Sequence, residues 1–69
     1  MSTVYEIRIE GHLDPSWSVW LEDMNIILLP NGETLLSGSV ADQAALFGLL
    51  NRIRDMNLKL VSVEKMPTL

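Results

Sequence analysis

Residues 26–37 read IILLPNGETLLS, in which the pair Asn31-Gly32 separates two apolar runs. An Asn-Gly pair in this setting is the strongest short-range signal of a β-hairpin, because both residues tolerate the positive φ angles of a two-residue type I′ turn. We therefore predict two antiparallel strands that meet at this turn. Pro30 has no backbone N–H to give to a ladder, which suits a strand at the edge of the sheet.

The chain after the hairpin predicts a helix. Apolar residues recur at helical spacing over residues 42–56, and Leu50 lies at the centre of this stripe. Asp42 is a suitable N-cap, either alone or in a capping box with the serine three residues before it. Asn57 tolerates the left-handed conformation that often follows a helix. Residues 58–63 then return as the last strand.

The chain before the hairpin predicts a strand and a short helix. Apolar and charged side chains alternate over residues 5–10, which is typical of a half-buried strand. Asp14 and Pro15 are favourable at the N-cap and at the first position of a helix. The apolar side chains that follow share one helical face: Trp17, Trp20, Leu21 and Met24. We expect the two tryptophans to belong to the core.

These elements predict one α+β domain over residues 1–69. Their order is β-α-β-β-α-β, which is the ferredoxin-like arrangement: an antiparallel four-stranded sheet in the order 4-1-3-2 with both helices on one face. The short first helix is the uncertain element, and without it the order is β-β-β-α-β. At this length the core is small, so part of the stability can come from a second copy.

The hairpin carries more apolar side chains than one buried face can take. If Leu28 lies opposite Leu35, and Ile27 opposite Leu36, each face carries three large aliphatic residues. Exposed patches of this kind often mark contacts. We therefore expect a homodimer formed through the hairpin, with these candidate contact residues: Ile26, Ile27, Leu28, Leu29, Leu35 and Leu36.

Composition limits the classes of partner. The net charge is −4 with only five basic residues, which disfavours binding to nucleic acid or to an anionic membrane surface. The chain has no cysteine, so disulfides and thiolate metal sites are excluded. No apolar run approaches the ~20 residues of a membrane helix, and the first residues have no signal-peptide pattern. We expect a cytoplasmic protein.

Seven short motifs are distributed along the chain: YEIR at 5–8, GHLD at 11–14, Trp17, Trp20, DQAAL at 42–46, GLL at 48–50 and RIRD at 52–55. With these motifs, the whole chain resembles a family of small uncharacterised prokaryotic proteins. Many members of that family carry His at the position of Phe47 and Gly at the position of Asn57. No activity is assigned to the family, so the resemblance implies no mechanism.

A second, weaker likeness is to ligand-binding regulatory domains of the ACT type. The predicted element order is similar to that of these domains, which place a Gly-rich turn after the first strand, at the effector site. The corresponding turn here spans residues 11–16 and lacks the glycine that should follow Pro15. The likeness implies a small-molecule site at this turn.

His12 is the only histidine, and Asp14 is its nearest acidic neighbour in sequence. Neither a metal-ligand pattern nor a catalytic motif surrounds them, so we expect no catalytic residue, metal or cofactor. Topology predicts that they share one end of the sheet with the hairpin turn and the end of the long helix. The candidate ligand or contact edge comprises His12, Asp14, Asn31, Arg54 and Asp55.

Phe47 lies off the apolar stripe of the long helix, which leaves it as either a residue at the border of the core or a contact residue. Taken together, the sequence favours a non-enzymatic, self-associating interaction module with an accessory or regulatory role, in which an unidentified further protein partner is an option beside the second copy. The alternatives are an ACT-like small-molecule sensor and a small oligomeric enzyme that uses His12.

Overall fold

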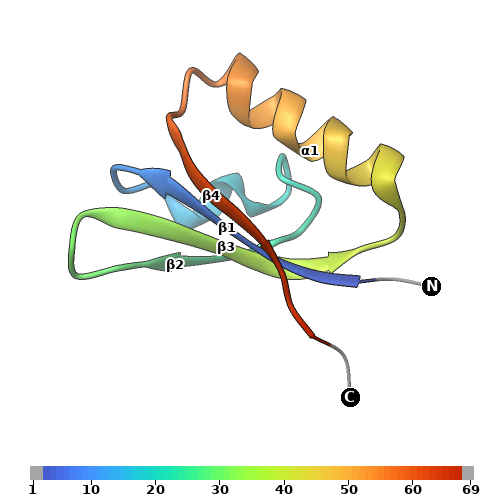
Figure 1. Cartoon of the computed structure of the whole chain (residues 1–69). Helices are drawn as coiled ribbons and strands as arrows, with labels where there is room; N and C mark the ends of the chain where they lie inside the picture. Colours follow the sequence, from blue (N-terminus) through green and yellow to red (C-terminus); the bar gives the residue numbers. More distant parts are fainter. Residues whose placement is uncertain (1–2, 68–69) are drawn as a thin grey trace.

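A computed structural model describes residues 3–67 as an antiparallel sheet with one α-helix lying across one of its faces (Figure 1). The strands stand in the order β2-β3-β1-β4, which is 4-1-3-2 when read from the β4 edge. The α+β class is therefore confirmed. The elements are β1 (Thr3–Glu10), the 3-10 helix η1 (Pro15–Ser18), β2 (Asn25–Leu28), β3 (Glu33–Val40), α1 (Gln43–Asp55) and β4 (Leu60–Lys65).

The predicted first α-helix is replaced by η1, which has only four residues. Its start is as expected, because the Asp14 carboxylate accepts the Ser16 N–H at 3.0 Å and Pro15 follows the cap. Serine, tryptophan and valine are weak helix formers, so the turn does not propagate. The ferredoxin-like β-α-β-β-α-β arrangement, which needs two α-helices, is therefore wrong for this chain. The regular elements follow the alternative order β-β-β-α-β.

The connection from η1 to β2 contains a tight turn that the sequence does not announce. Glu22 and Asp23 have φ angles of 57° and 58°, and the Met24 N–H donates to the Leu21 carbonyl at 3.1 Å. Positive φ at both central residues is the signature of a type I′ turn. The turn brings Leu21 and Met24 into the core, where both are buried.

The β2–β3 hairpin has a three-residue loop in place of the predicted two-residue turn. The Leu29 N–H donates to the Glu33 carbonyl at 2.8 Å, and among the loop residues only Gly32 has positive φ, at 89°. This is a type I turn that ends in a left-handed glycine. The strands therefore pair Ile26 with Leu36, Ile27 with Leu35 and Leu28 with Thr34.

This register differs by one residue from the predicted one. Because side chains alternate between faces, a shift of one residue on one strand exchanges the faces of its side chains relative to the other strand. Leu36 is fully buried under the helix, and its partner Ile26 packs against the core. Ile27 and Leu35 instead lie on the face of the sheet opposite α1, hereafter the open face.

The core lies between the sheet and two covering segments. Helix α1 covers it from one side, and the residues between β1 and β2 supply the rest. Asp42 caps α1 by accepting the Ala45 N–H at 2.8 Å, and Asn57 has φ 60° just after its end, as predicted. Leu50 is only half-buried, so the centre of the stripe was placed wrongly. The buried residues of α1 are Leu46, Leu49 and Ile53.

The close approach of Met24 to β3 explains Gly38. A Cβ at Gly38 would lie 2.7 Å from the Met24 Sδ atom, whereas a Cβ at Gly48 on α1 would meet nothing within 4 Å. We expect Gly38→Ala to lower the free energy of unfolding by about 1–3 kcal/mol, since the buried Met24 must move. Gly48→Ala should raise it by about 0.5–1 kcal/mol through helix propensity. Urea denaturation measures the free energy of unfolding of both variants. Equal changes in the two variants would contradict the close packing of Met24 against Gly38.

Candidate functional site

His12 and Asp14 are both engaged by backbone atoms. The His12 Nε2–H donates to the Leu29 carbonyl at 2.9 Å, and the Asp14 carboxylate accepts the Ser16 N–H at 3.0 Å. Neither side chain bonds to the other, and both residues are exposed. A general base is commonly oriented by a hydrogen bond to a second side chain. Here each of these side chains instead holds a turn.

The predicted edge is assembled only in part. Figure 1 places the end of β1, the β2–β3 hairpin and the C-terminal end of α1 at the same end of the molecule. The bond from His12 to Leu29 ties this histidine to the base of the hairpin. Asn31 bonds within the hairpin to Glu33, at 3.1 Å through its side-chain amide. Arg54 and Asp55 pair with each other at 3.4 Å, on the exposed side of α1.

Two further classes of site are absent from the described residues. No group of three or more His, Cys, Asp or Glu side chains within residues 3–67 is arranged to hold a metal ion. In the same range, no helix has the length and apolar character to cross a membrane.

A cavity of about 220 Å³ opens at the other end of the molecule, beside the first turns of α1. Its lining residues are mostly apolar, and Glu22 is the only ionisable residue among them. Sequence reasoning missed it, because it depends on the type I′ turn, which carries no Asn-Gly signal. The lining residues are Glu22, Met24, Ser39, Val40, Ala41, Ala45 and Leu49.

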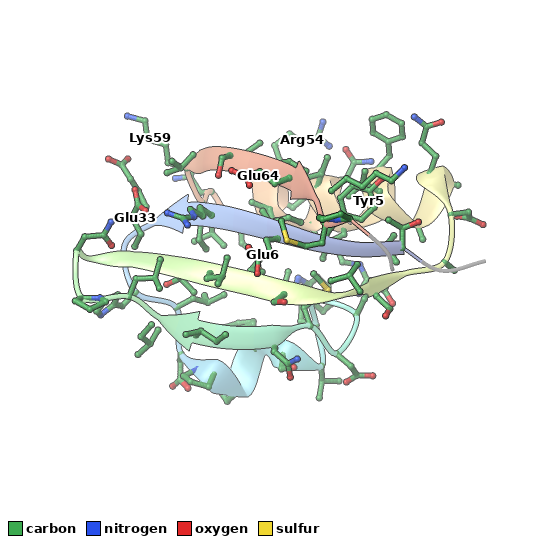
Figure 2. All side chains as sticks on the ribbon, turned by 60° about the horizontal axis from the view of Figure 1, so that its bottom comes forward. Tyr5, Glu6, Glu33, Arg54, Lys59 and Glu64 are labelled. Atoms are coloured by element: carbon green, nitrogen blue, oxygen red, sulfur yellow. The ribbon has the colours of Figure 1, made fainter. Side chains whose placement is uncertain are left out.

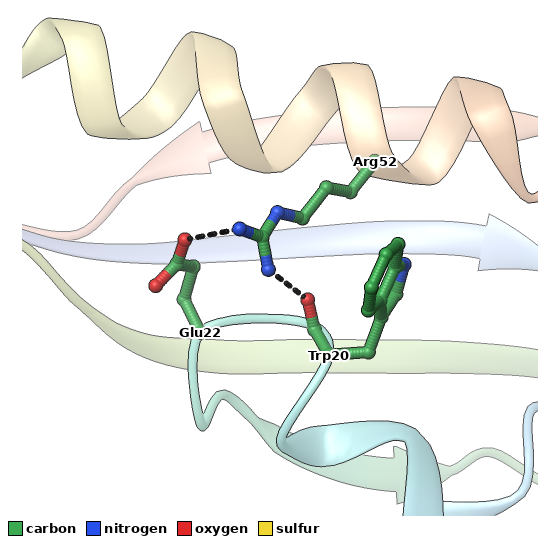
Figure 3. Close-up of polar contacts among 3 residues, drawn as sticks. All are labelled: Trp20, Glu22 and Arg52. Carbon is green, nitrogen blue, oxygen red and sulfur yellow. Dashed lines mark hydrogen bonds and ion pairs between the residues drawn. The ribbon is translucent and has the colours of Figure 1, made fainter.

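Arg52 is a second residue that sequence reasoning missed. Its guanidinium donates to the Trp20 carbonyl at 2.6 Å, pairs with the Glu22 carboxylate at 3.4 Å and lies 5.2 Å from the centre of the Trp20 ring (Figure 3). These contacts fasten the segment between η1 and β2 onto α1. The partners are 30 or more positions apart in sequence, so no local pattern joins them.

The tryptophans are not core, contrary to the prediction. Trp17 and Trp20 are 46% and 49% exposed, while Leu21 and Met24 from the same stripe are buried. The stripe assumed helical periodicity, which ends at Ser18. Phe47 is also exposed and lies outside the core cluster, so its role as a contact residue stays a prediction.

Figure 2 looks onto the open face of the sheet, which has a polar half and an apolar half. Towards β4, Glu6 lies directly opposite Glu64, and Arg8 follows on β1. Towards β2, Leu35 lies beside Arg8 and is paired with Ile27 at the edge. The apolar half is formed mainly by the β2–β3 hairpin, and Val4 of β1 is a further exposed apolar residue on this face.

The structure divides the six predicted contact residues between the two faces. Leu36 is fully buried and Ile26 packs on the core, so neither offers a side chain for contact on the open face. Leu29 and Leu35 are half-buried. The two that remain substantially exposed are Ile27 and Leu28, at 46% and 45%.

Comparison with known proteins identifies a family for this fold. The sequence model of one family, described as a domain of unknown function (DUF8691), matches residues 4–64. The chain belongs to this family. The DUF8691 match runs from β1 into β4 and includes the hairpin, so it agrees with the predicted resemblance to uncharacterised small proteins. Neither the curated proteins nor the solved structures contain a match to the chain.

Proposed function

We propose that this domain is a non-enzymatic interaction module that self-associates through β2 and the open face of the β2–β3 hairpin. The observation that carries the proposal is the exposure of Ile27, at 46%, on an edge strand. No charged side chain occurs between Asn25 and Pro30. Unprotected edges of this kind invite pairing with another chain.

The other edge of the sheet supports the choice of β2. Strand β4 has a register shift opposite Arg8 and Ile9, it contains Glu64 and Lys65, and Lys59 directly precedes it. Bulges and charges are the devices by which proteins discourage pairing at a sheet edge. Strand β2 has neither a bulge nor a charged residue, although it is short and η1 lies beside it.

The size of the exposed surface favours a weak and reversible association. Burying a whole aliphatic side chain contributes about 1.5–3 kcal/mol, and Ile27 and Leu28 are already about half-buried. Two copies of each offset only the lower end of the roughly 4–15 kcal/mol that association costs. An accessory or regulatory subunit in a cytoplasmic assembly, in which a further protein partner strengthens the contact, is consistent with this.

We expect Ile27→Glu to abolish self-association, because it places a charge in the apolar half of the open face. Val61→Glu is the matched control, since Val61 is equally exposed at 46% but lies on β4. In light scattering, the mean mass of the parent and of Val61→Glu should increase with protein concentration, whereas that of Ile27→Glu should not. Equal behaviour of the two variants would contradict the assignment of the contact to β2.

The cavity favours small-molecule binding as a second candidate function, at a different place from the predicted turn. Its mostly apolar lining and the Glu22 carboxylate, which also pairs with Arg52, suit a small molecule with an alkyl group and an amine. Isobutylamine and isobutyric acid are matched probes. Binding predicts that only the amine raises the melting temperature, and that Ala45→Leu, which fills the cavity, removes the effect. No difference between the two probes would exclude this candidate.

A further inference from the structure

The hydrogen-bond pattern of the hairpin determines which backbone groups of β2 face outward. The Leu29 N–H donates to Glu33, and the ladder continues with Ile27 opposite Leu35. In an antiparallel pair, residues alternate between those that exchange hydrogen bonds with the partner strand and those that do not. The N–H and C=O groups of Ile26 and Leu28 therefore point away from β3.

The outward groups on either side of this stretch are not free. The Ser18 hydroxyl donates to the Met24 carbonyl at 2.6 Å, and Pro30, the next outward-facing residue after Leu28, has no N–H. The open part of the edge is thus limited to residues 26–28, with two N–H donors and two C=O acceptors.

We infer that two copies of the chain join by antiparallel pairing of their β2 strands, with Ile27 on the two-fold axis and Ile26 opposite Leu28 of the second copy. This inference rests on the proposed self-association and specifies its geometry. The pairing forms four backbone hydrogen bonds and joins the two sheets into one of eight strands. A two-fold axis makes the same short edge serve both copies.

In the two neighbouring registers, fewer of the outward-facing backbone groups can form hydrogen bonds. Placing Ile26 opposite itself sets Leu28 against Met24, whose carbonyl already accepts the Ser18 hydroxyl. Placing Leu28 opposite itself sets Ile26 against Pro30, which has no N–H. Only the register centred on Ile27 pairs all four outward groups.

The same register also matches the side chains. On the open face it forms a row of Leu35 and Ile27 followed by Ile27 and Leu35 of the second copy. Asn25 then lies opposite Leu29, so no charged side chain faces another across the joint. The segment that includes η1 contributes Leu13, Leu21 and Met24 to the core on the α1 side. Figure 2 shows η1 alongside the outer edge of β2, and the Ser18 hydroxyl of η1 bonds to Met24 there, so a second copy would approach this edge from the open face of the sheet.

Disulfide cross-linking tests this register directly, because the chain has no cysteine of its own. Two Ile27→Cys chains would place their Cα atoms about 4.5 Å apart as a non-hydrogen-bonded pair, within the range of a disulfide. We expect oxidation to cross-link Ile27→Cys on the order of 100-fold faster than Val61→Cys, since pairing holds the thiols at a high effective concentration.

Two further variants sharpen the test. Leu35→Cys should cross-link as slowly as Val61→Cys, because its copies are separated by both β2 strands. Asn25→Cys and Leu29→Cys should cross-link rapidly when mixed and slowly when alone. If the parent is a dimer by mass but Ile27→Cys reacts no faster than Val61→Cys, the register is wrong and the proposed function stands. If the parent is a monomer, both fail.

Discussion

Replacing Leu49 by alanine is expected to lower the free energy of unfolding by about 2–5 kcal/mol. Leu49 is 1% exposed and lies on the buried face of α1 between Leu46 and Ile53. Truncation removes apolar contacts and leaves a cavity that the short helix and the sheet cannot both close. At roughly 0.05–0.15 kcal/mol per residue, a chain of this size has only a few kcal/mol of stability to lose.

Leu50→Ala is the matched control, since it removes the same atoms one position further along α1. Leu50 is half-buried at the border of the core, so we expect a clearly smaller loss. Urea denaturation, with the slope compared between variants, separates stability from changes in the unfolded state. A loss for Leu50→Ala that equals or exceeds that for Leu49→Ala would contradict the observed orientation of α1.

Thr34→Val is expected to cost about 2–4 kcal/mol, although it nearly conserves the shape of the side chain. Thr34 is the only fully buried polar side chain in residues 3–67. Its hydroxyl donates to the Gly11 carbonyl at 2.6 Å and accepts the Leu13 N–H at 3.0 Å. Valine would leave both backbone groups without this partner, at the point where the chain leaves β1.

The control for this prediction is Thr34→Ser, which keeps the hydroxyl and removes only the methyl group. We expect it to retain most of the stability that Thr34→Val loses, with both measured by chemical denaturation. Amide hydrogen exchange at Leu13 gives a second readout, because loss of the hydroxyl should expose that N–H in particular. Comparable stability of Thr34→Val and the parent would show that the two bonds contribute little.

The elements that the sequence predicts well are those set by local chemistry. Alternation over residues 5–10 identifies β1, because one face of the strand is buried and the other is open. Asp42 and Asn57 mark the ends of α1, since capping and a left-handed residue are properties of single positions. The edge position of β2 also followed from a local feature, the absence of an N–H at Pro30.

The features that were mispredicted depend on distant parts of the chain. The Asn-Gly pair is compatible with both a two-residue and a three-residue loop, and the one-residue difference exchanges the face of Leu36. The tryptophans leave the core because the chain turns sharply at Glu22 and Asp23. Little in the local sequence predicts that turn, since Glu22 does not favour positive φ and Asp23, although Asp is enriched there, is not followed by glycine. The contacts of Arg52 likewise require the tertiary fold.

Sedimentation equilibrium of the unmodified chain is the most direct test of self-association through β2. Run from micromolar to millimolar concentration, it should show reversible growth from the 7.8 kDa chain to twice that mass. The Ile27→Glu variant should stay at 7.8 kDa over the same range. A parent chain that remains at 7.8 kDa at every concentration would contradict the proposed function and the two-fold pairing of β2 that rests on it.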